Sequence, residues 1–132
     1  MAETRNSGRP LSPHLQIYRG GLTMMMSIVH RATGIALYAG TLVLVWWLSA
    51  AAASDEYFAM VQAILGSWIG QIVLFGFTWS LVHHTLGGIR HLIWDTGHGF
   101  DLPSVEAGAR ITIAASILIA IALWVFAYGV MS

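Results

Sequence analysis

Residues 111–132 read ITIAASILIAIALWVFAYGVMS and contain no charged side chain. A stretch of this length and apolarity predicts a membrane-spanning helix, which needs roughly 20 residues. Residues 32–54 and 57–89 form two more uncharged stretches that are long enough to span a bilayer. The whole chain is 57% hydrophobic and 9% charged, whereas soluble domains are about 25% charged. The sequence therefore predicts an all-α membrane protein with three transmembrane helices.

The limits of these helices follow from capping residues. Ser54 can cap the start of the second helix, and Pro103 can open the third. The second helix is longer than a bilayer requires, so it should tilt or project beyond the hydrocarbon. We expect a transmembrane domain over residues 22–132, with helices at about residues 22–52, 60–94 and 108–130.

Arginines mark one side of the predicted membrane. Four of them precede or open the first helix and two flank the second loop, whereas the loop at Asp55 and Glu56 has none. By the positive-inside rule, the N-terminus and residues 95–109 lie in the cytoplasm, or in the matrix of a mitochondrion. Residues 1–20 contain no apolar run of the kind found in cleavable signals. We therefore expect a multi-pass protein of a bacterial inner (cytoplasmic) membrane, or of the mitochondrial inner membrane in a eukaryote.

A first polar cluster lies at the cytoplasmic end of the first helix. Ser27, His30 and Arg31 are spaced i, i+3 and i+4, so their side chains project from one face. For Ser27 and Arg31 alone, a snorkelling arginine and a serine bonded to its own backbone explain the pattern as well as a binding site does. The adjacent histidine and a second cluster at the same depth favour a site, because polar residues in a membrane are costly and usually functional.

The second polar cluster lies near the end of the second helix. His84, Gly88 and His91 are spaced i, i+4 and i+7, along one stripe. His84 precedes Trp94 by ten residues, or ~15 Å, which places it inside the hydrocarbon. A histidine at that depth needs a partner, and neutral imidazole is a common axial ligand of haem iron. We favour haem ligation by His84 over an interhelical hydrogen bond.

Residues beside His84 bear on the same hypothesis. Gly87 and Gly88 remove side-chain bulk, which suits either the approach of a porphyrin or close helix packing, and both readings stay open. His83 points about 100° away from His84 and is the weaker ligand candidate. The chain has no cysteine, which excludes iron–sulfur ligation and covalently attached haem. Any haem is therefore held non-covalently.

Three motifs follow one another along the chain. They are Arg9-Pro10-Leu11-Ser12-Pro13-His14, Ser27-x-x-His30-Arg31-x-Thr33-Gly34 and His84-x-x-x-Gly88-Ile89-Arg90-His91-x-x-x-Asp95-x-Gly97. With these motifs, and over essentially the whole chain, the sequence resembles the cytochrome b subunit of succinate dehydrogenase, the C subunit and membrane anchor of respiratory complex II. The branch it resembles is the alphaproteobacterial and mitochondrial one, and no matched motif position departs from the pattern.

The resemblance implies a cofactor. The chain would form half of a haem-binding helical bundle that a second small membrane anchor subunit completes. His84 would be one axial ligand of a single b-type haem shared between these two chains, and the second histidine would come from the other subunit. His30, Arg31 and His91 match positions expected near the haem propionates.

The resemblance also implies a ubiquinone-reduction site, in which Ser27 and Arg31 match the family's quinone-site residues. Ubiquinone reduction takes two electrons and two protons and builds negative charge on carbonyl oxygens, which a guanidinium and a hydroxyl stabilise. Asp95 matches an acidic position near the quinone and is a candidate for the proton path. The chain would then be an electron-transfer and anchor subunit of succinate dehydrogenase (quinone), in the tricarboxylic acid cycle and the aerobic respiratory chain.

The resemblance also implies partner subunits. The chain has neither cysteines nor a glycine-rich dinucleotide turn, so it holds no flavin or iron–sulfur cluster itself and must receive electrons from a partner. In the family it resembles, FAD and the iron–sulfur clusters belong to a flavoprotein subunit and an iron–sulfur subunit. Residues 1–21 are too polar to enter lipid and are expected to lie in the cytoplasm against the iron–sulfur subunit. Zero net charge gives no sign of nucleic acid.

Three alternative functions stay open at this point. One is the anchor subunit of a related quinol:fumarate reductase, because the sequence does not fix the direction of the reaction. Another is a self-contained cytochrome b that carries electrons across the bilayer, although the outer half of the predicted membrane region has no histidine. The third is a non-redox anchor or assembly protein whose polar residues serve only to join helices.

Overall fold

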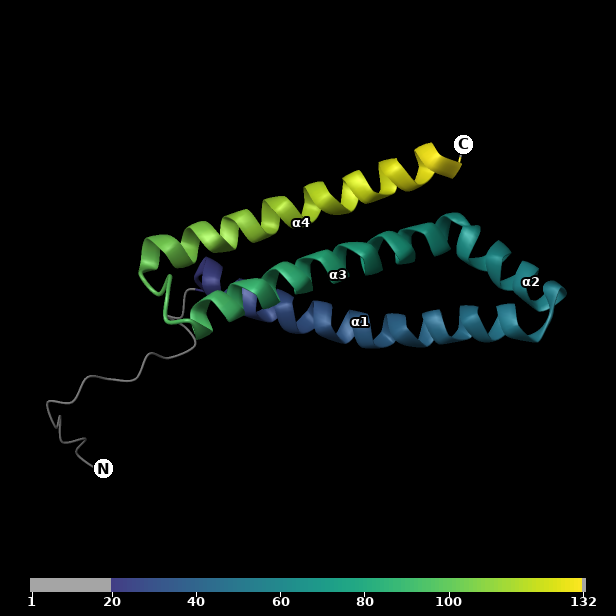
Figure 1. Cartoon of the computed structure of the whole chain (residues 1–132), viewed down its shortest axis with the longest axis horizontal. Helices are drawn as coiled ribbons and strands as arrows, with labels where there is room; N and C mark the ends of the chain where they lie inside the picture. Colours follow the sequence, from purple (N-terminus) through teal and green to yellow (C-terminus); the bar gives the residue numbers. More distant parts are fainter. Residues whose placement is uncertain (1–19, 132) are drawn as a thin grey trace, which may run out of the picture.

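Three long helices and one short helix make up residues 20–131, the part of the chain that the computed structural model describes (Figure 1). They are α1 (Leu22–Ala53), α2 (Asp55–Gly66), α3 (Trp68–Asp95) and α4 (Leu102–Met131). By length and apolarity α1, α3 and α4 can each cross a membrane. The prediction of an all-helical protein with three spans is confirmed. The Arg9–His14 motif lies outside the described residues, and so do residues 1–19 of the segment 1–21 that is expected to contact the iron–sulfur subunit.

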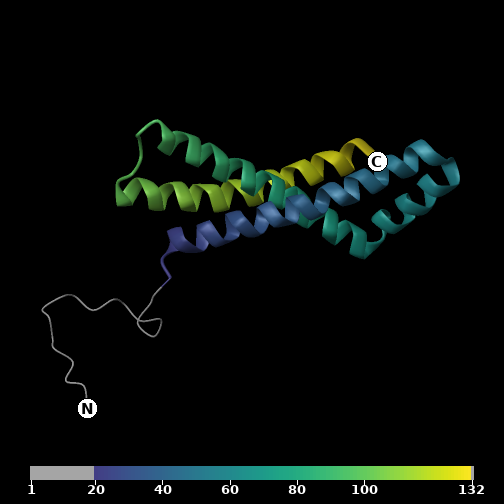
Figure 2. The same cartoon turned by 90° about the horizontal axis from the view of Figure 1, so that it is seen from below.

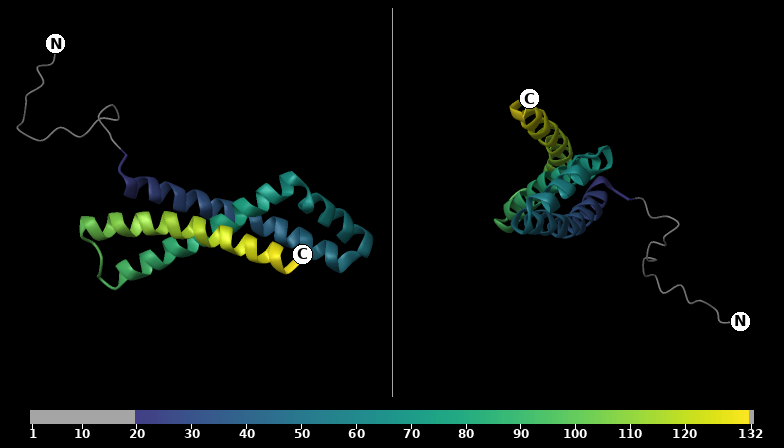
Figure 3. Two further views of the ribbon diagram at one scale, coloured as in Figure 1. Left: turned by 90° about the horizontal axis from the view of Figure 1, so that it is seen from above. Right: turned by 90° about the vertical axis from the view of Figure 1, so that its right-hand side faces the viewer.

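The three long helices pack side by side, with α3 between α1 and α4 (Figure 1). α3 crosses over both of its neighbours (Figure 2), and the end-on view shows the C-terminal end of α4 diverging from α1 (Figure 3). The start of α1 and the α3–α4 connection lie at one end of the molecule, and α2 lies at the opposite end. Both predicted polar clusters therefore lie at the same end.

The expected helix over residues 60–94 is not continuous, so this prediction was wrong. α2 ends at Gly66 and α3 begins at Trp68, and the backbone of Ser67 between them is extended, with φ −63° and ψ 159°. The residues that exceed the length needed to span a bilayer do not extend the second transmembrane helix beyond the membrane. They form a separate short helix that connects α1 to α3 (Figure 1).

The break at Ser67 is stabilised by side chains that replace the lost helical hydrogen bonds. The Ser67 hydroxyl donates to the Ile64 carbonyl at 2.6 Å and accepts from the Gly70 N–H at 3.2 Å. The Gln71 amide donates to the Leu65 carbonyl at 3.1 Å. These contacts satisfy backbone groups that helix ends leave unpaired, which is why a serine can end one helix and cap the next.

The α1–α2 connection matches the capping prediction. The Ser54 hydroxyl accepts from the Tyr57 N–H at 3.2 Å, as an N-cap residue does. Two indole N–H groups near the end of α1 then join the helices: Trp46 donates to the Tyr57 hydroxyl at 2.7 Å, and Trp47 donates to Gln62 Oε1 at 3.1 Å. The hairpin is thus held by polar contacts made by aromatic residues, typical of a membrane interface.

α4 begins earlier than the residue-108 start expected from the sequence. It starts at Leu102, because the Asp101 carboxylate accepts from the Ser104 N–H at 3.0 Å and so caps the first turn. The preceding connection turns through Gly97 and Gly99, whose φ values of 82° and 75° are accessible mainly to glycine. Residues 102–107, which lie before the expected start of the third helix, are therefore helical, and Pro103 lies in the first turn as its start signal predicts.

Candidate functional site

Three histidines from two helices meet at the end of the molecule that holds the start of α1. The His30 and His84 rings stack with centroids 4.0 Å apart and planes 14° from parallel. His91 lies edge-on to His30 at 5.3 Å. We call His30, His84 and His91 the histidine cluster. The two polar clusters that were separate in the sequence are thus in direct contact.

Two glycines allow this contact, one on each helix. A Cβ on Gly34 of α1 would lie 3.1 Å from His84 Cε1, and a Cβ on Gly87 of α3 would overlap the His30 ring. Of the two readings of the glycine pair, close helix packing therefore accounts for Gly87. Gly88 differs, because a Cβ there would meet nothing within 4 Å among the described residues. Clearance for a ligand thus stays open for Gly88.

The hydrogen bonds of His84 determine which ring nitrogen carries the proton. Its Nδ1 lies 3.1 Å from the His30 carbonyl and 3.2 Å from Thr33 Oγ1. A carbonyl only accepts, and the Thr33 hydroxyl already donates to that same carbonyl at 2.9 Å. Both contacts are therefore satisfied when His84 Nδ1 is the donor. This leaves the Nε2 lone pair of neutral His84 available.

That arrangement fits an axial haem ligand. A ligating histidine almost always donates its second ring N–H to a carbonyl or a similar acceptor, which fixes the tautomer and the ring orientation. His84 is half-buried, and the neighbouring Gly88 leaves space beside it. Within residues 20–131, no three His, Cys, Asp or Glu side chains are grouped so that they could hold a bare metal ion. The donor set thus offers one imidazole rather than a multi-residue metal site.

The other members of the cluster present polar groups at the same place. His30 Nε2 is buried and has no hydrogen-bond partner among the described residues. His91 is exposed and its ring lies edge-on to Trp94 at 5.0 Å, while the Arg90 guanidinium lies over the Trp94 ring, also at 5.0 Å. Among the described residues, four buried side-chain nitrogens lack a partner, and His30 Nε2 is the one that belongs to the histidine cluster.

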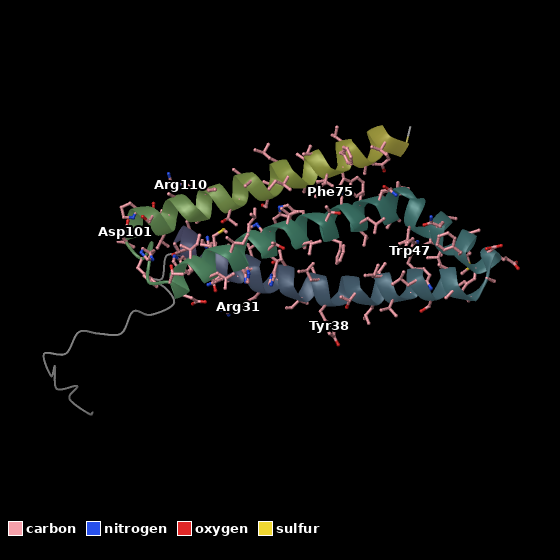
Figure 4. All side chains as sticks on the ribbon, viewed as in Figure 1. Arg31, Tyr38, Trp47, Phe75, Asp101 and Arg110 are labelled. Atoms are coloured by element: carbon pink, nitrogen blue, oxygen red, sulfur yellow. The ribbon has the colours of Figure 1, made fainter. Side chains whose placement is uncertain are left out.

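Ser27 and Arg31 form a pair on the exposed side of α1. Arg31 Nη2 donates to Ser27 Oγ at 3.1 Å, so Ser27 bonds to the arginine rather than to its own backbone. Arg31 lies on the side of α1 that faces away from α4 (Figure 4). Because Ser27 Oγ accepts this bond, its own hydrogen is free to be donated. Asp95, at the end of α3, is also exposed, and its carboxylate has no hydrogen-bond partner within residues 20–131.

His83 faces the opposite neighbour of α3. It is fully buried, and its Nδ1 lies 3.1 Å from Ser116 Oγ of α4. The weaker ligand candidate of the sequence is therefore enclosed within the chain, whereas His84 is not. Sequence reasoning missed Ser116, whose only signal was a serine in the middle of an apolar span. Thr33 belongs to one of the three sequence motifs, but the sequence alone predicts no role for it.

These features define a multi-pass helical membrane subunit with a histidine cluster between two of its spans. Residues 5–123 match the model of the succinate dehydrogenase/fumarate reductase transmembrane subunit family. The chain is 42% identical over 121 residues to the succinate dehydrogenase cytochrome b556 subunit of Paracoccus denitrificans, covering 92% of this chain and 93% of that one. It is also 38% identical over 117 residues to the cytochrome b556 subunit of Rickettsia prowazekii, covering 89% and 91%.

A mitochondrial relative extends the comparison. The succinate dehydrogenase cytochrome b560 subunit of Sus scrofa is 39% identical over 121 residues, covering 89% of this chain and 70% of that one. The chain therefore belongs to the succinate dehydrogenase cytochrome b subunits, the membrane subunits of complex II.

Proposed function

We propose that this chain holds one b-type haem through His84 Nε2 and contributes Ser27 and Arg31 to the ubiquinone-reduction site of succinate:quinone oxidoreductase. The observation that carries the haem assignment is the hydrogen bond from His84 Nδ1 to the His30 carbonyl, which leaves Nε2 free. The second axial histidine would come from a second small anchor subunit. A flavoprotein subunit and an iron–sulfur subunit would supply the electrons.

The chain's own residues would hold the haem in a fixed position. When bound, haem b exchanges single electrons at its iron. His30 would lie near the propionates, and its ring, which stacks against His84, would help to hold that ligand in place. His91 and Arg31 are exposed near the same helix ends and can interact with the outer part of the propionates. Gly88 would leave room for the porphyrin.

Ser27 and Arg31 would act on the quinone. Reduction places negative charge on a carbonyl oxygen, and a positioned guanidinium and hydroxyl stabilise that charge. The Arg31–Ser27 hydrogen bond orients both groups and leaves the Ser27 hydrogen and the remaining guanidinium N–H groups available. Asp95, whose carboxylate is exposed, is proposed to deliver protons from the cytoplasm, directly or through His91.

The haem assignment is tested by the absorption spectrum of the purified complex. His84→Ala should abolish or distort the low-spin b-type spectrum, because the iron loses one axial ligand. His98→Ala is the matched control, since His98 is exposed in the α3–α4 connection and its side chain bonds to Thr96. A wild-type spectrum in His84→Ala would refute haem ligation by this residue.

The quinone assignment is tested by comparing two electron acceptors. Ser27→Ala and Arg31→Ala should each slow quinone reduction by about 100-fold or more, since losing one donor to a developing oxyanion costs ~3 kcal/mol. Succinate oxidation by an artificial dye should stay near wild type, because electrons then leave before the quinone. Arg110→Ala, which removes an exposed arginine of α4, is the control. Near-normal quinone turnover in both site variants would contradict the assignment.

A further inference from the structure

Two consecutive histidines attach α3 to different neighbours. His84 Nδ1 contacts the His30 carbonyl of α1, and His83 Nδ1 contacts Ser116 Oγ of α4 at 3.1 Å. Successive side chains of a helix project about 100° apart, so these bonds leave α3 in different directions at the same level of its axis. α3 is thereby attached to both neighbouring spans beside the candidate haem ligand.

The polarity of the His83 bond is fixed. The Ser116 hydroxyl donates to the Ile113 carbonyl of its own helix at 2.9 Å. Its hydrogen is therefore used, and the oxygen can only accept from His83. His83 thus carries its proton on Nδ1, as His84 does. His84 therefore donates only to α1 and His83 only to α4, because the acceptor of each imidazole belongs to a different helix.

The His83 bond has no substitute within the chain. His83 is 1% exposed and Ser116 is 0% exposed, so water does not reach either residue in the chain. His83 Nε2 has no hydrogen-bond partner among the described residues, and the nearest ring is that of Trp79 at 5.1 Å. Loss of the Ser116 hydroxyl would leave both ring nitrogens of His83 without a hydrogen bond in an apolar contact. A rotation of α3 is the simplest change that would remove the cost of burying this unpaired polar group.

We infer that His83 is a positioning residue for the haem: its bond to Ser116 sets the rotation of α3 and thereby the direction of His84 Nε2. This inference rests on the proposed function of His84. Both imidazoles are attached to adjacent Cα atoms of one rigid helix, so a rotation that moves His83 away from Ser116 also moves His84. Two other hydrogen bonds join α4 to α3, from Trp124 to Thr78 and from Tyr128 to Gln71, but both lie farther from His84 along α3 than the His83 bond does.

The experiment compares two buried hydroxyls of α4 in the assembled complex. Ser116→Ala removes the acceptor of His83. Thr112→Val is the matched control, because Thr112 is also buried on α4 but its hydroxyl donates only to the Gly108 carbonyl of its own helix. His83→Leu removes the donor instead and gives an independent second variant. Haem content, the rate of haem loss in detergent and the low-spin EPR signal are measured for each.

We expect Ser116→Ala and His83→Leu to shift the low-spin EPR signal, which reports the orientation of the axial imidazoles. Haem loss should be on the order of 10-fold faster, as for other residues that orient a metal ligand. Thr112→Val should match wild type in both readouts. A wild-type EPR signal and haem retention in Ser116→Ala, or an equal loss in Thr112→Val, would overturn the inference.

His84→Ala in the same series separates this inference from the proposed function. If His84→Ala loses the b-type spectrum while Ser116→Ala and His83→Leu keep the wild-type signal, the positioning role is wrong and the ligand assignment stands. If His84→Ala keeps the wild-type spectrum, the ligand assignment itself is wrong and the inference falls with it.

Discussion

Small residues decide where the histidines of this chain can lie. Gly34 gives space to His84, and Gly87 gives space to His30, so each helix provides the gap that the other helix fills. Such small-residue contacts let two spans approach closely where lipid provides no hydrophobic drive for association. The same closeness brings the His30 carbonyl to His84 Nδ1 and so sets the free nitrogen of the candidate ligand. Packing and chemistry therefore depend on the same residues.

The first prediction concerns Gly87→Ala. The new Cβ would overlap the His30 ring, which must shift away from His84, and overpacking of this kind costs about 1–3 kcal/mol. The apparent melting temperature of the purified complex should fall. Gly76→Ala is the control, because a Cβ at Gly76 of the same helix meets nothing within 4 Å. Equal melting temperatures of the two variants would show that the contact between α1 and α3 at Gly87 tolerates the extra methyl group.

Part of this site was predictable from single residues. The shared face of Ser27 and Arg31 follows from helical spacing alone, and the hydrogen bond between them bears it out. The tautomer of His84 does not follow from spacing, because it depends on Thr33 and the His30 carbonyl, which lie more than 50 positions earlier in the chain. The same holds for His83, whose partner Ser116 is on another helix. Spacing gives the face of a residue but not the atom that it meets.

At the scale of elements, the break at Ser67 shows what hydropathy does not detect. The uncharged stretch over residues 57–89 favours one long helix, because serine and glycine interrupt neither the charge pattern nor the apolar content. The interruption depends on local hydrogen bonds, in which one hydroxyl serves both helix ends, and on the absence of a Cβ at Gly70 beside the Leu65 carbonyl. The start of α2 was predictable, because Ser54 precedes two acidic residues.

The second prediction concerns the start of α4. Hydrogen bonds from the side chain and the backbone N–H of Ser104 hold the pKa of Asp101 below its ordinary value. A lowered folded-state pKa means that the cap stabilises the helix above the unfolded pKa, about 3.9. The stabilisation is lost as the pH falls through the folded pKa. Ser104→Ala should raise the pKa of Asp101, measured by carboxyl ¹³C NMR titration of the protein in detergent.

The control for the Asp101 titration is a substitution at the cap of a different helix. Ser54→Ala removes the cap serine of α2, far from Asp101 in the chain, and should leave the Asp101 titration unchanged. A carboxyl that titrates at or above its ordinary value in the wild-type protein would show that Asp101 does not cap α4. The first turn of α4 should then be insensitive to acid in this range.

At the scale of the whole molecule, the described chain buries few of its own apolar residues. In the most apolar stretch of α1, only 6% of the residues are buried within the described chain. The corresponding share is 17% in α3 and 17% in α4. Composition predicted a membrane protein, and the structure adds that the three spans do not enclose a core by themselves. The exposed apolar faces are those that a membrane-spanning subunit presents to its surroundings. A site completed by a second anchor subunit is consistent with this exposure.

The ends of the molecule carry different chemistry. The start of α1, which carries Arg31, and the α3–α4 connection lie at one end, and α2 with its acidic first turn lies at the other (Figure 1). The positive-inside rule assigns the first end to the cytoplasm or matrix. The absence of cysteine from the sequence makes this orientation accessible to experiment, because any introduced thiol is the only one in this chain.

The third prediction is therefore a labelling pattern. Glu56→Cys, in the first turn of α2, and His98→Cys, in the α3–α4 connection, place single thiols at exposed positions before and after α3. α3 has 28 residues, which at about 1.5 Å per residue exceeds the ~30 Å hydrocarbon core. In sealed vesicles with the outer face outward, a membrane-impermeant maleimide should label the Glu56→Cys chain. It should label the His98→Cys chain only after detergent is added. The reverse pattern would place the histidine cluster on the outer side, and labelling of both without detergent would contradict a membrane-spanning α3.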